Sequence, residues 1–160
     1  MAGNTLEIPR GATMCLTKAG LAIGDGAKTG PALASPVGAG IDFVINGIAY
    51  HKADAATVLP LTAATVQPVL TTCLYLICVN AALAVTSVQG TPVLSADLAA
   101  GNATLDIPEP TAGTCPIGAV KVACTVAATF TPGTTALDAS DIVETYYDFA
   151  GGLPSRPFTS

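Results

Sequence analysis

Apolar and polar residues alternate with a period of two in several short stretches of this chain. This alternation is typical of β-strands. The clearest case is IDFVINGIAYH (residues 41–51), where two apolar runs flank the pair Asn46-Gly47. Asn and Gly best tolerate the positive φ angles of a two-residue type I′ turn. The pattern therefore predicts an antiparallel hairpin with strands at residues 43–45 and 48–51.

Later stretches predict more strands of the same kind. A second hairpin is expected around Asn80-Ala81-Ala82, and residues 119–126 and 142–149 alternate again. A short apolar segment at residues 58–61 is interrupted by proline, and residues 95–100 favour a short helical turn. About seven short strands with Pro-, Gly-, Asn- and Thr-rich connections predict an all-β fold, either an antiparallel β-sandwich or a small, jelly-roll-like β-barrel.

The first 40 residues have a different pattern. They are rich in Gly and Ala, contain three prolines and keep neither a strand nor a helix period. We expect an extended N-terminal arm over residues 1–40, with one short strand near residues 14–16. Because the segment is apolar, we expect it to lie on another surface, although a flexible tail is the alternative. The expected division is an arm (1–40), a β domain (41–150) and a C-terminal loop tail (151–160).

Composition adds information about partners. Hydrophobic residues make up 51% of the chain and charged residues only 11%, where about 25% is usual. Such a chain cannot easily cover its surface with polar groups, so we expect a homo-oligomer or a component of an assembly. The net charge of −5 and six scattered basic residues argue against nucleic-acid binding.

Residues 69–85 are apolar enough to suggest a membrane span. Thr71, Thr72 and Asn80 interrupt this segment, and no basic residues flank it. We therefore expect a hairpin here and no membrane partner. The first residues have no basic stretch followed by an apolar one, so we expect no secretion signal.

The cysteines predict buried thiols. An odd count of five, at positions 15, 73, 78, 115 and 124, fits a reducing compartment. Cys73 and Cys78 are five residues apart, so on one strand their side chains lie on opposite faces. The chain has one histidine and no C-x-x-C motif, and we expect no metal site.

Candidate catalytic and ligand-binding groups are weak. GDGAKTG (24–30) lacks the spacing of a phosphate loop, and Pro31 occupies the place where the required helix would begin. His51 lies beside Lys52 and Asp54 and is interpreted as a solvated strand end.

The acidic groups near one another, Asp106 with Glu109 and Asp138 with Asp141 and Glu144, are interpreted as turn formers and solubilising charges. We expect no enzyme activity, no catalytic residues and no cofactor.

Four segments, in order, resemble a known family. They are FVINGIAYHKADAATVLPLTAATVQP (43–68), CLYLICVNAALAVTSVQG (73–90), CPIGAVKV (115–122) and FTPGTTALDASDIVETYYD (130–148). Together they are similar to head decoration, cement or head-fibre proteins of tailed bacteriophages. The resemblance covers about residues 41–149 and excludes the first 40. The sequence departs from the family pattern in having Cys at several Ala or Val positions, and Ala-Leu-Ala after Asn80.

The resemblance implies a structural role in the virion. It implies binding to the major capsid protein on the outer capsid surface, where the chain would cement neighbouring capsomers, with a trimer as the favoured oligomer. The protein would be made in the host cytoplasm and carried on the virion. The alternative is a tail-fibre or adhesin-like β module that contacts host carbohydrate, although such a module usually needs exposed aromatic residues and this chain has few.

Overall fold

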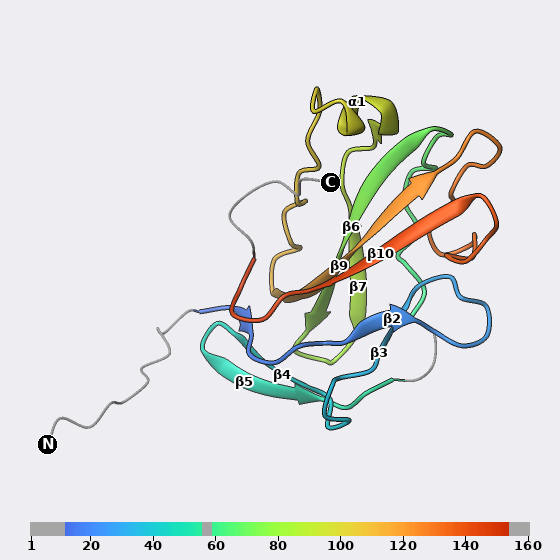
Figure 1. Cartoon of the computed structure of the whole chain (residues 1–160). Coiled ribbons are helices and arrows are strands. Elements are labelled where there is room, and N and C mark those ends of the chain that lie inside the picture. The colour runs from blue at the N-terminus through green and yellow to red at the C-terminus, as the bar shows by residue number, and fades with distance from the viewer. Residues whose placement is uncertain (1–11, 56–58, 154–160) are drawn as a thin grey trace, which may run out of the picture.

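One long strand, β6 (Thr71–Asn80), runs through the centre of the molecule (Figure 1). The computed structural model describes residues 12–55 and 59–153. Nine of the ten residues of β6 are buried, and an unbroken apolar run of this kind is typical of a strand covered on both faces. The strand belongs to a five-stranded antiparallel sheet of order β10-β9-β6-β7, with β8 also paired to β6. Its other members are β7 (Val85–Gln89), β8 (Val93–Leu94), β9 (Thr114–Cys124) and β10 (Ile142–Asp148), and the short helix α1 (Ser95–Ala99) follows β8.

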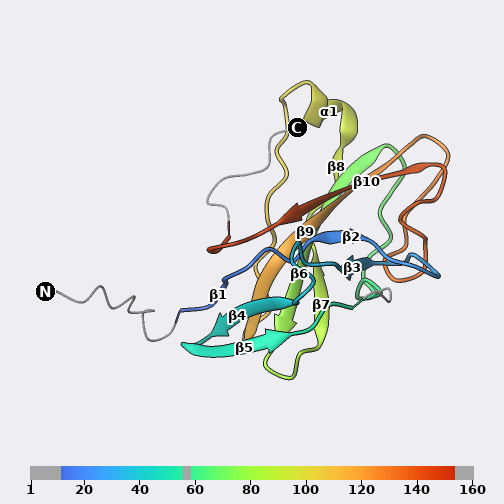
Figure 2. The ribbon, with the colours of Figure 1, turned by 60° about the horizontal axis from the view of Figure 1, so that its bottom comes forward.

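Two smaller sheets cover one face of this central sheet. Figure 2 turns them toward the viewer, with β6 and β9 behind them. The other face is covered by the irregular chain between α1 and β9. The result is an all-β, antiparallel, sandwich-like fold, as the alternation pattern predicted. The smaller sheets are β1-β4-β5 (Met14–Cys15, Ile41–Ile45 and Ile48–Lys52) and β2-β3 (Leu21–Ile23 and Pro31–Leu33).

The core is divided by β6 into two parts. Alternate residues of the strand point to opposite faces of the sheet. Tyr75 and Ile77 pack into the larger cluster, together with Phe43 and Leu33 of the small sheets and with Phe130. Leu74, Leu76 and Cys78 pack into a smaller cluster with Ala119 and Phe149, and Ile107 of the irregular chain lies against it. We call these sides the first and the second face of the sheet.

Both predicted hairpins are confirmed. Ile45 pairs with Ile48 across the turn, where Asn46 and Gly47 have φ angles of 51° and 81°, as a type I′ turn requires. In the second hairpin the Asn80 side chain accepts hydrogen bonds from the backbone N–H groups of Ala82 and Ala84. Leu83 has a φ of 63°, so it belongs to the turn and the strand begins only at Val85.

Strand β9 begins five residues earlier than the alternation predicted. Pro116 and Gly118 hid its first half, because both residues are disfavoured inside strands. The structure accommodates them at a bulge: Cys78 pairs with Pro116 and Ile77 with Gly118, so Ile117 is an extra residue on β9. A Cβ atom on Gly118 would come within 2.4 Å of both Leu21 and the Tyr147 carbonyl oxygen, which explains the glycine.

The prediction of an extended arm over residues 1–40 is wrong for residues 12–40. Ala19, Leu21 and Leu33 are buried in the first-face cluster, and β1 pairs with β4. The predicted short strand near residues 14–16 is confirmed by β1, whereas β2 and β3, with three residues each, are too short to show a period and were missed. Residues 1–11 lie outside the described residues.

The other end of the described chain meets this region. The Gly151 N–H donates a 2.7 Å hydrogen bond to the Cys15 carbonyl. Residues 151–153 form no strand, whereas the rest of the predicted tail, residues 154–160, lies outside the described residues. Of the predicted segment at 58–61, residue 58 is also outside them, and residues 59–61 are not in a strand.

Candidate interaction surface

His51 forms a cross-strand pair with an aspartate. Its Nδ1 atom lies 2.8 Å from Asp42 Oδ1, and both side chains are more than half exposed. The prediction of a solvated strand end is confirmed, but the neighbour differs. Asp54 accepts hydrogen bonds from the backbone N–H and the hydroxyl of Ser35 instead. An exposed pair of this kind is worth little to stability.

The GDGAKTG stretch forms the connection between β2 and β3. Lys28 Nζ lies 2.6 Å from Asp138 Oδ2 in an exposed ion pair, and the hydrogen bond to that carboxylate raises the pKa of Lys28. Pro31 begins strand β3. No helix N-terminus is therefore aimed at this turn, and the backbone geometry of a phosphate loop is not formed.

Two of the predicted turn-forming acids, Asp138 and Asp141, have structural partners. Asp138 pairs with Lys28, and Asp141 accepts a hydrogen bond from the Thr125 hydroxyl at the end of β9. The Asp141 carbonyl also accepts from the Thr125 N–H. These contacts close the chain between β9 and β10.

All five cysteines are buried free thiols. Cys73 lies on the first face and Cys78 on the second, as their spacing predicted. Desolvation raises the pKa of Cys15 and Cys78 to about 11, and the pKa of Cys73 and Cys115 to about 12. Because the folded chain holds these protons more tightly than the unfolded chain, the stability they contribute is complete below pH 9 and is lost as the pH rises toward 11 to 12. Within residues 12–55 and 59–153, no group of three or more His, Cys, Asp or Glu side chains could hold a metal ion.

Three segments without charged residues lie beside one another along one side of the central sheet. The chain contains no Asp, Glu, Lys, Arg or His between Asp54 and Asp97, and none between Lys121 and Asp138. The fold brings parts of these two stretches together (Figure 1). We define the uncharged surface as residues 61–70 with their two flanks, residues 85–95 and 125–133.

Backbone and side-chain hydrogen bonds join these three segments. Thr62 and Ser87 exchange two bonds, each from a backbone N–H to the hydroxyl of the other residue. Gln67 and Phe130 exchange backbone bonds on the opposite flank. Leu70 donates to the Thr125 carbonyl and accepts from the Ser95 N–H. The segment 61–70 is thus held on both sides.

The central segment of this surface is mostly exposed. Residues 62–66 and 68–70 are all exposed, whereas Leu61 and Gln67 are buried and act as anchors. The Gln67 side chain donates to the carbonyls of Thr71 and Val122 and accepts from the Tyr75 hydroxyl. Every polar atom of this buried side chain is therefore satisfied, which fixes the position of the segment.

Exposed large apolar side chains concentrate on this surface. Leu70, Leu94 and Val126 are 49%, 53% and 73% exposed, and the hydrogen bonds of Leu70 place their backbones next to one another. Val66 and Val69 are also exposed. Exposed apolar side chains gathered in one region of the surface mark an interaction site on many proteins. Sequence reasoning missed this surface, although the gap in charged residues was a visible signal.

Comparison of the chain with protein-family models, with curated proteins and with solved structures gives no match. Among the described residues, no helix has the length and apolar character needed to span a membrane.

Proposed function

We propose that the protein is a non-enzymatic virion structural protein that binds the outer surface of a tailed-phage capsid and cements neighbouring capsomers. The partner would be the major capsid protein. The observation that carries the proposal is that the four segments with a family resemblance belong to one folding unit. They contain most of the β4-β5 hairpin with the start of segment 61–70, most of the β6-β7 hairpin, most of strand β9, and strand β10 with the connection that leads into it.

The physical character of the domain supports the same role. A cement protein needs a rigid body and surfaces that other protein chains can cover. The central sheet is buried on both faces. The fully hydrogen-bonded side chain of Gln67 holds the segment 61–70 against it. The low content of charge suits contacts that are desolvated on assembly.

The test is quantitative mass spectrometry of purified virions of the phage that encodes the chain. We expect a copy number comparable to that of the major capsid protein. A copy number typical of tails or fibres would overturn the capsid assignment in favour of the tail-fibre module, and absence from virions would overturn both.

A further inference from the structure

We propose that Asn46 is a deamidation site whose rate of modification is set by Ala12 and Thr13. This inference goes beyond the proposed function, because it concerns the chemistry of the folded chain and does not depend on a capsid. Two observations carry it. The pair Asn46-Gly47 forms the exposed turn between β4 and β5, and hydrogen bonds to residues 12 and 13 hold this turn.

The pair Asn46-Gly47 contains both groups that the reaction needs. In deamidation the backbone nitrogen of Gly47 attacks the side-chain Cγ atom of Asn46, so that a new C–N bond forms and the bond from Cγ to Nδ2 breaks. The side-chain nitrogen leaves as ammonia and takes the proton that the Gly47 nitrogen loses. Water then opens the resulting succinimide ring at one of its two carbonyls, which gives either aspartate or isoaspartate. Both residues are exposed, and glycine has no side chain that hinders the attack.

The two residues before β1 hold this turn in place. The Gly47 N–H donates a 2.9 Å hydrogen bond to the Ala12 carbonyl, and the Asn46 N–H donates a 3.1 Å hydrogen bond to the Thr13 hydroxyl. The proton that the attacking nitrogen must lose is therefore held in a hydrogen bond. The turn also fixes the φ angles of Asn46 and Gly47 at 51° and 81°. The attack consequently requires a local opening that breaks these bonds, and only a small fraction of folded molecules is open in this way at any time.

The two products of the reaction affect the hairpin differently. Asp-Gly is, like Asn-Gly, a favoured pair for a two-residue type I′ turn, so aspartate at position 46 keeps the pairing of Ile45 with Ile48. Isoaspartate adds a methylene group to the main chain, and the same two residues then no longer close the turn in this register. Strand β4 contributes Phe43 and Ile45 to the first-face cluster. Loss of the hairpin therefore loosens the cover of the central sheet.

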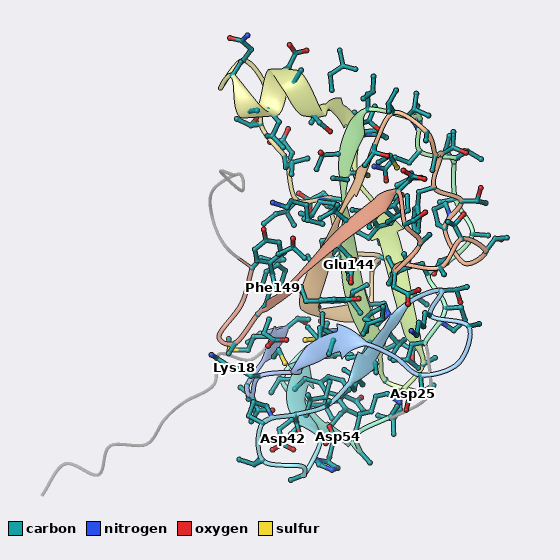
Figure 3. The ribbon with its side chains drawn as sticks, turned by 45° about the vertical axis from the view of Figure 1, so that its right-hand side comes forward. Lys18, Asp25, Asp42, Asp54, Glu144 and Phe149 are labelled. Carbon is teal, nitrogen blue, oxygen red and sulfur yellow. The ribbon has the colours of Figure 1, made fainter. Side chains whose placement is uncertain are left out.

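The test measures the deamidation rate of Asn46 in the full chain at one pH and temperature, by mass spectrometry of its peptides. Thr13→Ala removes the hydroxyl that holds the turn, and Thr13→Ser restores one. Thr17→Ala is the matched control, because the Thr17 hydroxyl accepts a 2.9 Å hydrogen bond from the Asp42 N–H at the other end of β4. Figure 3 shows Asp42 on the layer of the small sheets, together with Lys18, the neighbour of Thr17 in the chain. Circular dichroism confirms that the variants are folded.

We expect Asn46 to deamidate at least about tenfold more slowly in the folded wild-type chain than in the same chain unfolded in urea, because the attack waits for the turn to open. Thr13→Ala should raise the rate several-fold, whereas Thr13→Ser and Thr17→Ala should leave it near the wild-type value. Equal rates in the folded and the unfolded wild-type chain would overturn the inference, and this comparison holds even if Thr13→Ala does not fold. Equal rates in folded Thr13→Ala and Thr17→Ala would also overturn it.

A second measurement compares the two products. Asn46→Asp reproduces the aspartate product with its added charge, and we expect its thermal transition to lie close to that of the wild-type chain. A sample that has been aged until isoaspartate predominates should unfold at a clearly lower temperature, because its turn is not closed. Equal melting temperatures for the isoaspartate form and Asn46→Asp would overturn the structural effect that we assign to the modification.

Discussion

The two faces of the central sheet are buried in different ways. The two small sheets lie over the first face and their strands pair through backbone hydrogen bonds, with Leu61, Phe130 and Leu137 of the connecting segments packed beside them. Irregular chain covers the second face, where Ile107 and Phe149 pack on Leu74, Leu76 and Cys78. Both covers exclude water from the sheet, since Leu76 and Ile77 are both buried. The two faces are thus equally buried but covered by different kinds of structure. We therefore expect the same substitution to destabilise the fold by different amounts on the two faces of β6.

The largest expected effect comes from removing each cover. Deleting residues 12–38 removes β1, β2 and β3 and exposes the first-face cluster. We expect this variant to lose its cooperative thermal transition. Replacing residues 100–112 by a Gly/Ser linker of equal length should leave a folded but less stable domain, because a smaller cluster is uncovered. Calorimetry of both variants makes the comparison. A cooperative transition in the deletion variant, with none in the linker variant, would reverse the order of the two covers.

Two neighbouring residues of β6 allow a smaller and more local comparison of the stability of the two faces. Ile77 and Leu76 are both buried, on the first and the second face respectively. We expect Ile77→Ala to lower the free energy of unfolding by about 4 kcal/mol and Leu76→Ala by about 2 to 3 kcal/mol, because irregular chain can collapse into the cavity more easily than paired strands can. Urea unfolding measures both values. A larger loss in Leu76→Ala would mean that the second face is the more rigid one.

The hydrogen bonds of the buried Gln67 side chain contribute to stability on the first face, and a substitution measures this contribution. Gln67→Leu leaves the carbonyls of Thr71 and Val122 without their side-chain donor and removes the acceptor of the Tyr75 hydroxyl. We expect a loss of about 2 to 3 kcal/mol, because unsatisfied buried polar groups retain their desolvation cost.

Gln89 provides the control for this prediction. Its side chain donates to the Thr65 carbonyl and the Tyr75 hydroxyl from a partly exposed position. Water can replace these contacts, so Gln89→Leu should cost less than about 1 kcal/mol. Equal losses in the two variants would show that Gln67 does not anchor the segment 61–70.

The smallest effect concerns thiol reactivity. Burial raises the pKa of Cys78 to about 11 and that of Cys73 to about 12, so both are protonated at neutral pH and react only when the fold opens. The irregular cover should open more often than paired strands do. We expect Cys78 on the second face to be alkylated several-fold faster than Cys73, as measured by peptide mapping after timed maleimide labelling. Identical rates for all five thiols would indicate that only global unfolding exposes them.

The sequence predicted the parts of this fold whose strands are long enough to show a period. The hairpin at Asn46-Gly47 and the strands β6, β7, β9 and β10 belong to this group. Once the turn is placed, its register also pairs Asp42 with His51, so this contact could have been predicted by counting outward from Asn46-Gly47. The strand β1 was expected near residues 14–16, but β2 and β3 could not be predicted, because runs of three residues carry no period of their own.

The uncharged surface could be predicted only in part. The absence of charge between Asp54 and Asp97 is a property of the sequence. The pairing of Gln67 with Phe130 cannot be read from the sequence pattern. These two residues are far apart along the chain, with the long strands β6 and β9 between them. The local pattern of apolar and polar residues carries no information on contacts between distant segments. These segments form one surface only in the folded chain.

The hydrogen bond from the Gly151 N–H to the Cys15 carbonyl has a mechanical consequence. It places the entry and exit of the described chain side by side, so a tensile load applied through both flanks converges on this point. The bond between them carries the load first, followed by the two residue pairs that join β1 to β4. We expect these contacts, and the Phe149 N–H to Ile117 carbonyl bond on the exit side, to break before the pairs between β6 and β9, which neither flank loads directly. The domain should therefore yield stepwise from this corner and refold from an intact central sheet when the tension is released.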